Sequence, residues 1–244
     1  MNENKEEILS GGMSTESVIK MGDRVHRTLS PNHRFVHGVL LHLEQNDFAY
    51  SPRLLGVDKH GREVLTFIEG EVPRAFPMTI QHKIEAVHIL RNLHDALATG
   101  GLRGECETVC HHDFAPWNII INNDEVVGVI DFDDAVPGNR VDDLAYCVWN
   151  FLDLGVSEAS DGQQIQEMVG LVDAYGLEEK PDLVPAILQQ QSRILDFRHQ
   201  VVSDSEDEAM VEFSKNAILQ IQQSMDWVRR NRAAIEKALT VKVK

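Results

Sequence analysis

The chain is short of cysteine and of long apolar runs, and each shortage excludes a class of protein. Only three cysteines, Cys106, Cys110 and Cys147, occur among 244 residues, and they lack the paired spacing of a zinc or redox site. No apolar run approaches the roughly 18 residues needed to cross a bilayer. The first residues are charged where a signal peptide needs an apolar core. We therefore predict a cytoplasmic protein with reduced thiols and no membrane partner.

Positive charge is also scarce. The chain has 23 Lys and Arg residues against 39 Asp and Glu residues, a formal net charge of -16. Phosphate backbones are bound through clustered cations, so this balance argues against a nucleic-acid partner. A cationic small molecule fits the charge better, although an acidic surface also serves solubility alone. No feature of the sequence indicates an oligomeric state.

The first third of the chain has the pattern of a small α+β unit. Residues 17–29 carry two β-branched runs around Gly22 and Asp23, a pair suited to a tight hairpin turn. Apolar periodicity then predicts a helix followed by two strands, at 35–43, 52–57 and 63–68. Gly and Pro in residues 69–73 mark a linker.

Beyond the linker the apolar pattern becomes mainly helical. Apolar residues recur at helical spacing in five segments, at 80–97, 141–154, 163–174, 182–199 and 209–239. The 43% hydrophobic content is enough to bury a core in a chain of this length. We therefore predict an α+β fold with a small N-terminal lobe, residues 1–70, and a larger helical lobe, residues 71–244.

Residues 110–146 are the segment richest in chemistry. Two β-rich runs, 119–121 and 126–130, are separated by polar residues and predict an antiparallel hairpin. If the turn is centred between residues 124 and 125, paired residues have numbers that add to about 249. Asn118 then lies opposite Asp131, and an amide oxygen and a carboxylate converge at the open end of the hairpin.

A carboxylate and an amide oxygen are ligands that Mg2+ accepts in enzymes that use nucleotides. The hairpin therefore predicts a magnesium site made by Asn118 and Asp131. Asp113 lies five residues before Asn118, on a loop that Pro116 keeps from being helical. This position suits a carboxylate that orients and deprotonates a substrate hydroxyl. His111 is expected to pack under the loop and to hydrogen-bond it.

The order of these residues resembles the aminoglycoside and choline-type phosphotransferases, which belong to the protein-kinase-like superfamily. The matching elements are His111-His112-Asp113, Asn118, Asp131-Phe132-Asp133 and Asp143-Leu144-Ala145. The resemblance implies a kinase-like two-lobed fold and Mg2+-dependent transfer of a phosphoryl group from ATP or GTP to a hydroxyl of a small-molecule acceptor. It implies that Asp113 is catalytic, that Asn118 and Asp131 bind the metal, and that His111, Asp133 and Asp143 support them.

The same resemblance implies where the nucleotide binds. Gly11 and Gly12 look like part of the loop over the phosphates, where glycine lets backbone amides approach an anion. A structural turn would also explain two glycines. Phe67 and Ile68 end the strand whose backbone meets the base. By hairpin register, Arg27 takes the place of the strand lysine that holds the α and β phosphates.

Two departures from the family pattern put this nucleotide grip in doubt. Arginine binds phosphate as a planar fork and is no simple substitute for a lysine ammonium. The helix glutamate expected to pair with the strand lysine is missing: the region near His37 has no carboxylate, and Glu44 lies two turns later. Arg27 could instead be a surface charge on an edge strand.

Two other functions compete with phosphotransfer. His111-His112-Asp113 superficially resembles the His-Asp pair of HD-type metal phosphohydrolases, but those pairs lie on helices and Pro116 breaks a helix here. A kinase-like protein that binds a nucleotide or small molecule with little or no turnover is the second alternative. The Arg27 substitution favours it, and the intact Asp113, Asn118 and Asp131 oppose it.

Overall fold

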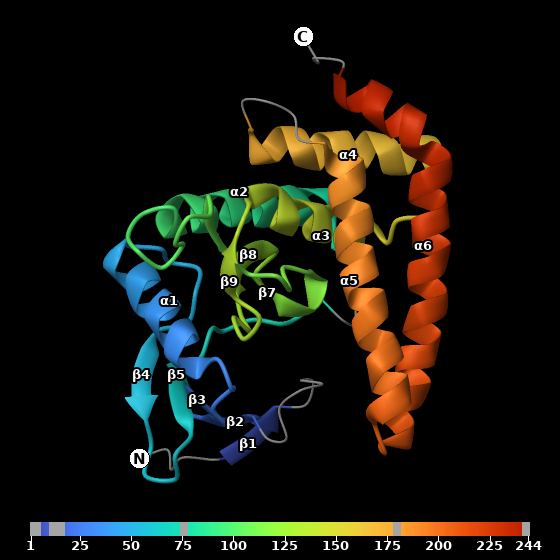
Figure 1. Ribbon diagram of the computed structural model, residues 1–244. Helices are drawn as coiled ribbons and strands as arrows, with labels where there is room; N and C mark the ends of the chain where they lie inside the picture. Colours follow the sequence, from blue (N-terminus) through green and yellow to red (C-terminus); the bar gives the residue numbers. More distant parts are fainter. Residues whose placement is uncertain (1–5, 10–17, 74–77, 178–181, 241–244) are drawn as a thin grey trace. The chain divides into compact units, whose positions relative to one another are not determined.

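The computed structural model describes residues 6–9, 18–73, 78–177 and 182–240 (Figure 1). The chain forms two compact units, one of residues 1–77 and 91–139, the other of residues 78–90 and 140–244. The two units are defined by the compactness of their internal contacts, and their boundaries differ from those of the expected lobes, 1–70 and 71–244. The lobe boundary concerns where nucleotide and acceptor bind, and it stays a prediction.

A five-stranded antiparallel sheet begins the first unit. Its strands are β1 (Glu6–Leu9), β2 (Val18–Met21), β3 (Arg24–Arg27), β4 (Leu54–Val57) and β5 (Glu63–Thr66). Their order in the sheet is β1-β2-β3-β5-β4. The predicted hairpin at 17–29 is confirmed: β2 and β3 pair around Gly22, whose φ of 66° suits a tight turn. β3 lies between β2 and β5, so it is an inner strand.

The helix α1 (His33–Gln45) follows β3, as the periodicity predicted. Its apolar residues Val36, Val39, Leu40 and Leu43 are buried, because a spacing of three and four residues puts them on one face. This face anchors the helix in the first unit. The helix α2 (Ile80–Leu97) has the bounds that the sequence predicted, and it begins in the second unit and ends in the first.

Short strands position the chemically rich segment. β6 (Thr108–Cys110) pairs with β9 (Val136–Gly138), and β7 (Ile119–Asn122) pairs with β8 (Glu125–Val129). The 3-10 turn η1 (Pro116–Asn118) leads directly into β7. The pairing of β6 with β9 therefore brings the two ends of the segment 108–138 together and holds its loops in place. The sequence did not predict β6 or β9.

The predicted register of the β7–β8 hairpin is wrong by one residue. Ile119 pairs with Val129, so residue numbers add to 248, and an irregularity follows between Ile120 and Ile121. The turn consists of Asn123 and Asp124, both with positive φ, which is the backbone twist of a tight two-residue hairpin turn. Asn118 consequently lies opposite Ile130, whose N–H donates to the Asn118 carbonyl at 2.9 Å.

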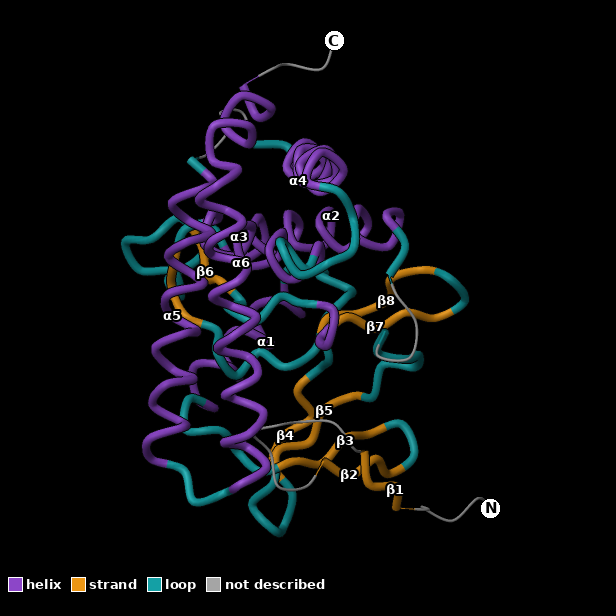
Figure 2. Tube along the Cα trace, turned by 90° about the vertical axis from the view of Figure 1, so that its right-hand side faces the viewer, coloured by secondary structure: helices purple, strands orange, loops and turns teal. Residues whose placement is uncertain are grey.

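The second unit is helical. After the first part of α2 come α3 (Arg140–Leu152), α4 (Asp161–Tyr175), α5 (Leu183–Asp204) and α6 (Glu208–Thr240). All four were predicted, with bounds shifted by up to five residues. α5 and α6 run side by side in both views (Figure 2), joined inside by a hydrogen bond of 2.8 Å from Gln191 Nε2 to Ser224 Oγ.

Local signals fix the ends of α4. The Ser160 hydroxyl accepts from the Gln163 N–H at its start, and Gly176, with φ 74°, ends it. Trp227 on α6 donates its indole N–H to Asp161 at 2.7 Å, tying α6 to the first turn of α4. No helix within the described part of the chain is long and apolar enough to cross a membrane.

Candidate active site

The loop after β6 is fixed from below by His111, as the sequence predicted. Its Nε2 donates to the Ile130 carbonyl at 3.1 Å, and its Nδ1 accepts from the Asp113 N–H at 3.3 Å. The carbonyl can only accept and the amide can only donate, so these two bonds define one tautomer. The ring is 1% exposed and lies against Phe132, 4.6 Å between centroids. His111 therefore couples the loop to the strand that precedes Asp131.

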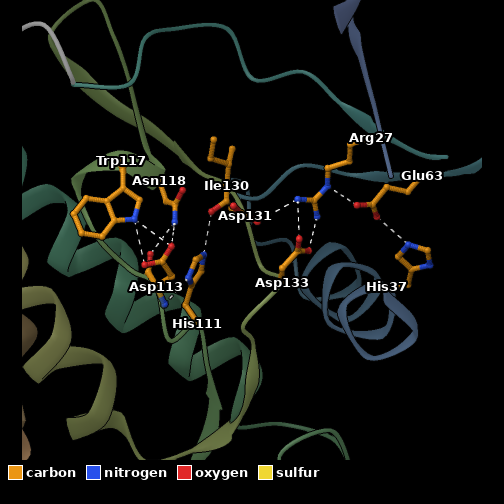
Figure 3. A network of polar contacts seen from close by, with 10 residues as sticks. All are labelled: Arg27, His37, Glu63, His111, Asp113, Trp117, Asn118, Ile130, Asp131 and Asp133. Atoms are coloured by element: carbon orange, nitrogen blue, oxygen red, sulfur yellow. Dashed lines mark hydrogen bonds and ion pairs between the residues drawn. The ribbon is translucent and has the colours of Figure 1, made fainter. Parts of the chain in front are cut away.

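Two side chains of the η1 turn hold the Asp113 carboxylate (Figure 3). Trp117 donates its indole N–H to both carboxylate oxygens, at 3.2 and 3.1 Å. Asn118 Nδ2 donates to Asp113 Oδ2 at 2.7 Å and to the Asp113 carbonyl at 2.9 Å. Pro116 was expected to keep this loop from being helical, but it starts a 3-10 turn of three residues, because its fixed φ suits a first helical position. The carboxylate is thus oriented before any substrate is present.

Asn118 and Asp131 keep one oxygen each for another ligand. The Asn118 amide nitrogen is committed to Asp113, and its Oδ1 has no hydrogen-bond partner among the described residues. Asp131 Oδ1 pairs with Arg27, and within the same described set its Oδ2 has no partner. Asp131 follows Ile130 with φ 65°, a left-handed conformation that redirects its side chain. Amide and carboxylate oxygens are ligands that Mg2+ accepts, so Asn118 Oδ1 and Asp131 Oδ2 fit the ion that the sequence predicts.

Arg27 is the centre of an ion-pair cluster. Its Nε bonds Glu63 Oε1, its Nη1 lies 3.1 Å from Asp131 Oδ1 and 3.2 Å from Asp133 Oδ2, and its Nη2 lies 2.7 Å from Asp133 Oδ1. The residue is 7% exposed on an inner strand, so it is no surface charge on an edge strand. Three carboxylates surround one guanidinium, and the excess of two negative charges matches a divalent cation.

Glu63 supplies the carboxylate that the helix lacks. It is the direct cross-strand partner of Arg27 in the β3–β5 ladder and is 1% exposed. Its second oxygen, Oε2, lies 3.0 Å from His37 Nε2 on α1. No carboxylate stands near His37 in the sequence, and Glu63 was not predicted as the partner of Arg27. The missing information was the pairing of β3 with β5, which joins residues 36 positions apart.

The cluster perturbs its own members. Burial by itself lowers the pKa of Arg27, but the charges of Asp133, Glu63 and Asp131 outweigh burial and raise that pKa above its ordinary value. Burial raises the pKa of Asp133, against the opposing effect of Arg27. The guanidinium is therefore permanently charged, and carboxylate charge around it is in excess.

The other predicted site residues are dispersed. Gly11 and Gly12 lie outside the described residues. Phe67 donates its backbone N–H to Asp23 at 2.8 Å, and the Lys20 ammonium lies 3.5 Å from the centre of its ring. Ile68 packs at Gly128, where a Cβ would come within 2.8 Å of it. Their contact with a nucleotide base stays a prediction.

Asp143 belongs to the second unit. It lies in the first turn of α3 and is fully buried. Burial, followed by the charge of Asp143, raises the pKa of the Cys147 thiol well above its ordinary value. Support of the catalytic loop by Asp143 stays a prediction.

Comparisons with known proteins identify the family that the sequence resembles. Residues 104–181 match the model of a family described as the phosphotransferase enzyme family, APH. The trifolitoxin immunity protein of Rhizobium leguminosarum bv. trifolii is 33% identical over 200 residues, which cover 72% of this chain and 76% of that protein.

Solved structures confirm the predicted kinase-like α+β fold. The GDP complex of wild-type aminoglycoside 2'-phosphotransferase-IIIa has a TM-score of 0.61 at 12% identity, covering 93% of this chain and 94% of that one. A choline/ethanolamine kinase family protein from Mesorhizobium loti has a TM-score of 0.58 at 15% identity, covering 93% and 92%. At these identities the likeness establishes the fold alone.

Proposed function

The chain belongs to the phosphotransferase enzyme family, and we propose that it transfers the γ-phosphoryl group of ATP or GTP to a hydroxyl of a small molecule. The observation that carries the proposal is the Asp113 carboxylate, held by Trp117 and Asn118 on a loop that His111 braces. Phosphoryl transfer needs positioning and charge stabilisation more than covalent chemistry. A pre-oriented carboxylate beside metal-type oxygen donors is suited to it.

In this mechanism Asp113 accepts the proton of the acceptor hydroxyl as the oxygen attacks the γ-phosphorus. The bond from that phosphorus to the bridging oxygen breaks, and ADP or GDP leaves with its electron pair. Its two donors limit rotation of the carboxylate, so that an oxygen lone pair stays directed at the hydroxyl. Asn118 Oδ1 and Asp131 Oδ2 would hold Mg2+, which supplies charge neutralisation of the phosphates when bound. Asp133 positions Arg27, and Asp143 braces the loop.

Arg27 takes part mainly by positioning. A guanidinium has five N–H groups, and the four contacts to Glu63, Asp131 and Asp133 leave one Nη2 hydrogen for a phosphate oxygen. We propose that this hydrogen meets the nucleotide, together with backbone amides at Gly11 and Gly12. Phe67 and Ile68 are proposed to line the base.

The acceptor is proposed to be a toxic small molecule that the modification inactivates. The relative called trifolitoxin immunity protein supports this, because 33% identity extends over 76% of that protein. The net charge of -16 favours a cationic acceptor. The expected setting of the reaction is the cytoplasm, with no nucleic-acid or membrane partner.

A binding protein without turnover is the second candidate. It is favoured by Arg27, because four of its five N–H groups are committed to carboxylates. Such a protein would protect by sequestering the toxin. The same fixed Asp113 that supports catalysis has no evident purpose in this alternative.

Nucleotide binding is tested by thermal unfolding with ADP, ATP, GDP and GTP, each with and without Mg2+. A ligand at about 100 times its Kd stabilises the native state by about 2.7 kcal/mol. We expect a magnesium-dependent rise in Tm that Asp131→Asn abolishes. The matched control is Asp134→Asn, an exposed neighbour with the same charge. Equal Tm values with and without nucleotide would contradict the proposed site.

Turnover is tested by incubating the protein with nucleotide and trifolitoxin, an aminoglycoside or an amino alcohol, and weighing the product by mass spectrometry. Asp113→Asn should slow phosphoryl gain by about 10²–10⁴-fold with nucleotide affinity unchanged. If Asp113→Asn cells survive the toxin as well as wild-type cells, protection does not need transfer. The binding protein would then be the better account.

A further inference from the structure

His37 brings a titratable side chain of α1 to the ion-pair cluster around Arg27. Its Nε2 lies 3.0 Å from Glu63 Oε2, and Glu63 bonds Arg27 through its other oxygen (Figure 3). A carboxylate oxygen only accepts, so His37 donates its Nε2–H. That N–H is present both in the neutral tautomer and in the protonated ring. Protonation at Nδ1 therefore changes the charge of His37 without breaking its bond to Glu63.

The ring of His37 can exchange a proton with solvent, because its side chain is 18% exposed. Its neighbour on α1, His33, lies edge-on at 5.6 Å between centroids, and His33 Nδ1 donates to the Ser30 carbonyl at 2.8 Å. Arg34 on the same helix is exposed, and β4, which also contacts α1, carries no titratable side chain. Histidine ordinarily changes charge between pH 5 and 8. His37 can therefore add one positive charge near neutral pH.

The charges that face His37 come from three other parts of the first unit. β5 supplies Glu63 in direct contact, and β3 supplies Arg27 behind it. The segment after β8 supplies Asp131 and Asp133, which both bond Arg27. One guanidinium among three carboxylates leaves an excess of two negative charges while His37 is neutral. A proton on His37 reduces that excess to one.

We propose that His37 is a positioning residue that couples a proton to the metal site, so that a proton on His37 competes with the divalent cation held by Asn118 and Asp131. Neutral His37 leaves the full negative charge of the cluster to attract the cation. Cation affinity is then highest above the pH at which His37 loses its proton, and it falls as the pH drops through that value. The inference rests on the proposed function and deepens it by naming a regulator of the same site.

The first test measures binding of Mn2+ alone to the full chain, without nucleotide, from the electron paramagnetic resonance signal of free Mn2+. Asp131→Asn identifies the part of the binding that belongs to this site. Affinity there should be about 3- to 10-fold weaker at about pH 5.5 than at about pH 8, as expected for one added charge near a partly screened cation.

Two variants assign the proton. His37→Gln keeps an N–H donor for Glu63 but cannot titrate, so its Mn2+ affinity should be the same at both pH values and close to the wild-type affinity at about pH 8. His42→Gln is the matched control, because His42 lies on the same helix and its Nε2 contacts the Ala96 carbonyl and the Thr99 hydroxyl. It should keep the wild-type pH dependence.

The second test observes the proton itself. Coupling between two ligands is reciprocal, so saturating Mg2+ should lower the pH at which His37 titrates by about 0.5 to 1 unit, which is the same 3- to 10-fold factor. The imidazole C–H resonances report this in an NMR titration with and without Mg2+. The His37 resonance is the one missing from His37→Gln, and the His42 resonance should not respond to Mg2+.

Three results would overturn the proposal. They are an absence of saturable Mn2+ binding at this site, equal wild-type affinity at both pH values, and undiminished pH dependence in His37→Gln. The third result would assign the proton to Asp133, whose pKa is raised by burial.

Failure of the proposed function can be told apart from failure of this inference. If Mn2+ binding depends on pH through His37 but no phosphoryl group is transferred, the proton coupling stands and the activity proposal falls. If transfer occurs while Mn2+ affinity is independent of pH, the reverse holds. Circular dichroism of His37→Gln checks that the fold is retained, as expected for a variant that keeps the hydrogen bond.

Discussion

Replacing Arg27 by methionine should destabilise the protein severely, because it removes the only guanidinium that contacts the three carboxylates of the cluster among the described residues. Glu63 is 1% exposed. In this variant its carboxylate would be buried without the guanidinium that neutralises it. Removing one member of a buried ion pair typically costs about 3–5 kcal/mol. Asp131 and Asp133 retain some solvent exposure, so we expect the loss to fall within that range and not above it.

The double variant Arg27→Met/Glu63→Gln gives the sharper result. Glu63→Gln alone should cost about 1.5–3 kcal/mol, the value of a hydrogen bond to a charged group, because Arg27 keeps Asp131 and Asp133. In the Arg27→Met background the same change removes an uncompensated buried charge, so it should restore stability. We therefore expect the double variant to be more stable than Arg27→Met, which makes the two effects strongly non-additive.

The assay is urea unfolding followed by circular dichroism, with the four proteins compared at one pH and salt concentration. Arg24→Met is the matched control, since Arg24 lies on the same strand, is exposed and pairs with exposed Asp23. It should change stability by less than about 0.5 kcal/mol. Additive losses, or a double variant less stable than Arg27→Met, would refute the account of a buried charge cluster.

Two further predictions concern packing. Gly70→Ala should lower the free energy of unfolding by about 1–3 kcal/mol. Gly70 has φ 146°, and a Cβ there would lie 2.6 Å from the Ile121 carbonyl oxygen. Gly101→Ala is the control: a Cβ there would meet no atom within 4 Å, so it should be nearly neutral in the same unfolding assay. A thiol reagent near neutral pH should label partly exposed Cys106 rapidly and Cys147 only after unfolding, because Cys147 is buried and burial raises the pKa of its thiol. Peptide mapping identifies the labelled cysteine. Rapid labelling of Cys147 in the folded protein would contradict its burial.

The elements governed by local signals could be predicted from the sequence. Helical periodicity located the six α-helices of the described residues, and α2 has the predicted bounds at both ends. The hairpin at Gly22 was predicted from two β-branched runs and the turn residues between them. The ordered set of Asp113, Asn118 and Asp131 identified the family, because those residues occur within twenty positions of one another and their spacing is fixed by one loop and one hairpin.

The register of that hairpin could not be predicted, and the reason is physical. Both turn residues, Asn123 and Asp124, adopt positive φ, and the ladder shifts after Ile120. Each of these features shifts the register of the strand pairing, and neither can be predicted from residue types alone. The expected opposition of Asn118 and Asp131 was therefore wrong, even though both retain an oxygen suited to a metal.

Glu63 shows that the carboxylate that pairs with a buried cation can lie on a different element, where the local sequence does not reveal the pairing. A buried cation needs a carboxylate within bonding distance, and it does not matter whether a helix or a strand supplies it. Here the partner stands opposite Arg27 in the β3–β5 ladder. In protein kinases the corresponding glutamate lies on a helix, and movement of that helix makes or breaks the pair.

A pair fixed by a β-ladder responds differently to helix movement. The pairing of β3 with β5 holds Arg27 and Glu63 opposite each other at one end of the ladder. Among the described contacts of this pair, α1 contributes His37, through a 3.0 Å bond to Glu63 Oε2. A shift of α1 would therefore cost one hydrogen bond and leave the ion pair intact. It follows that the Arg27–Glu63 pair forms whenever β3 and β5 pair, whereas Asp131 and Asp133 join it from the segment after β8. Because Glu63 stands on a strand, movement of α1 does not by itself break the pair.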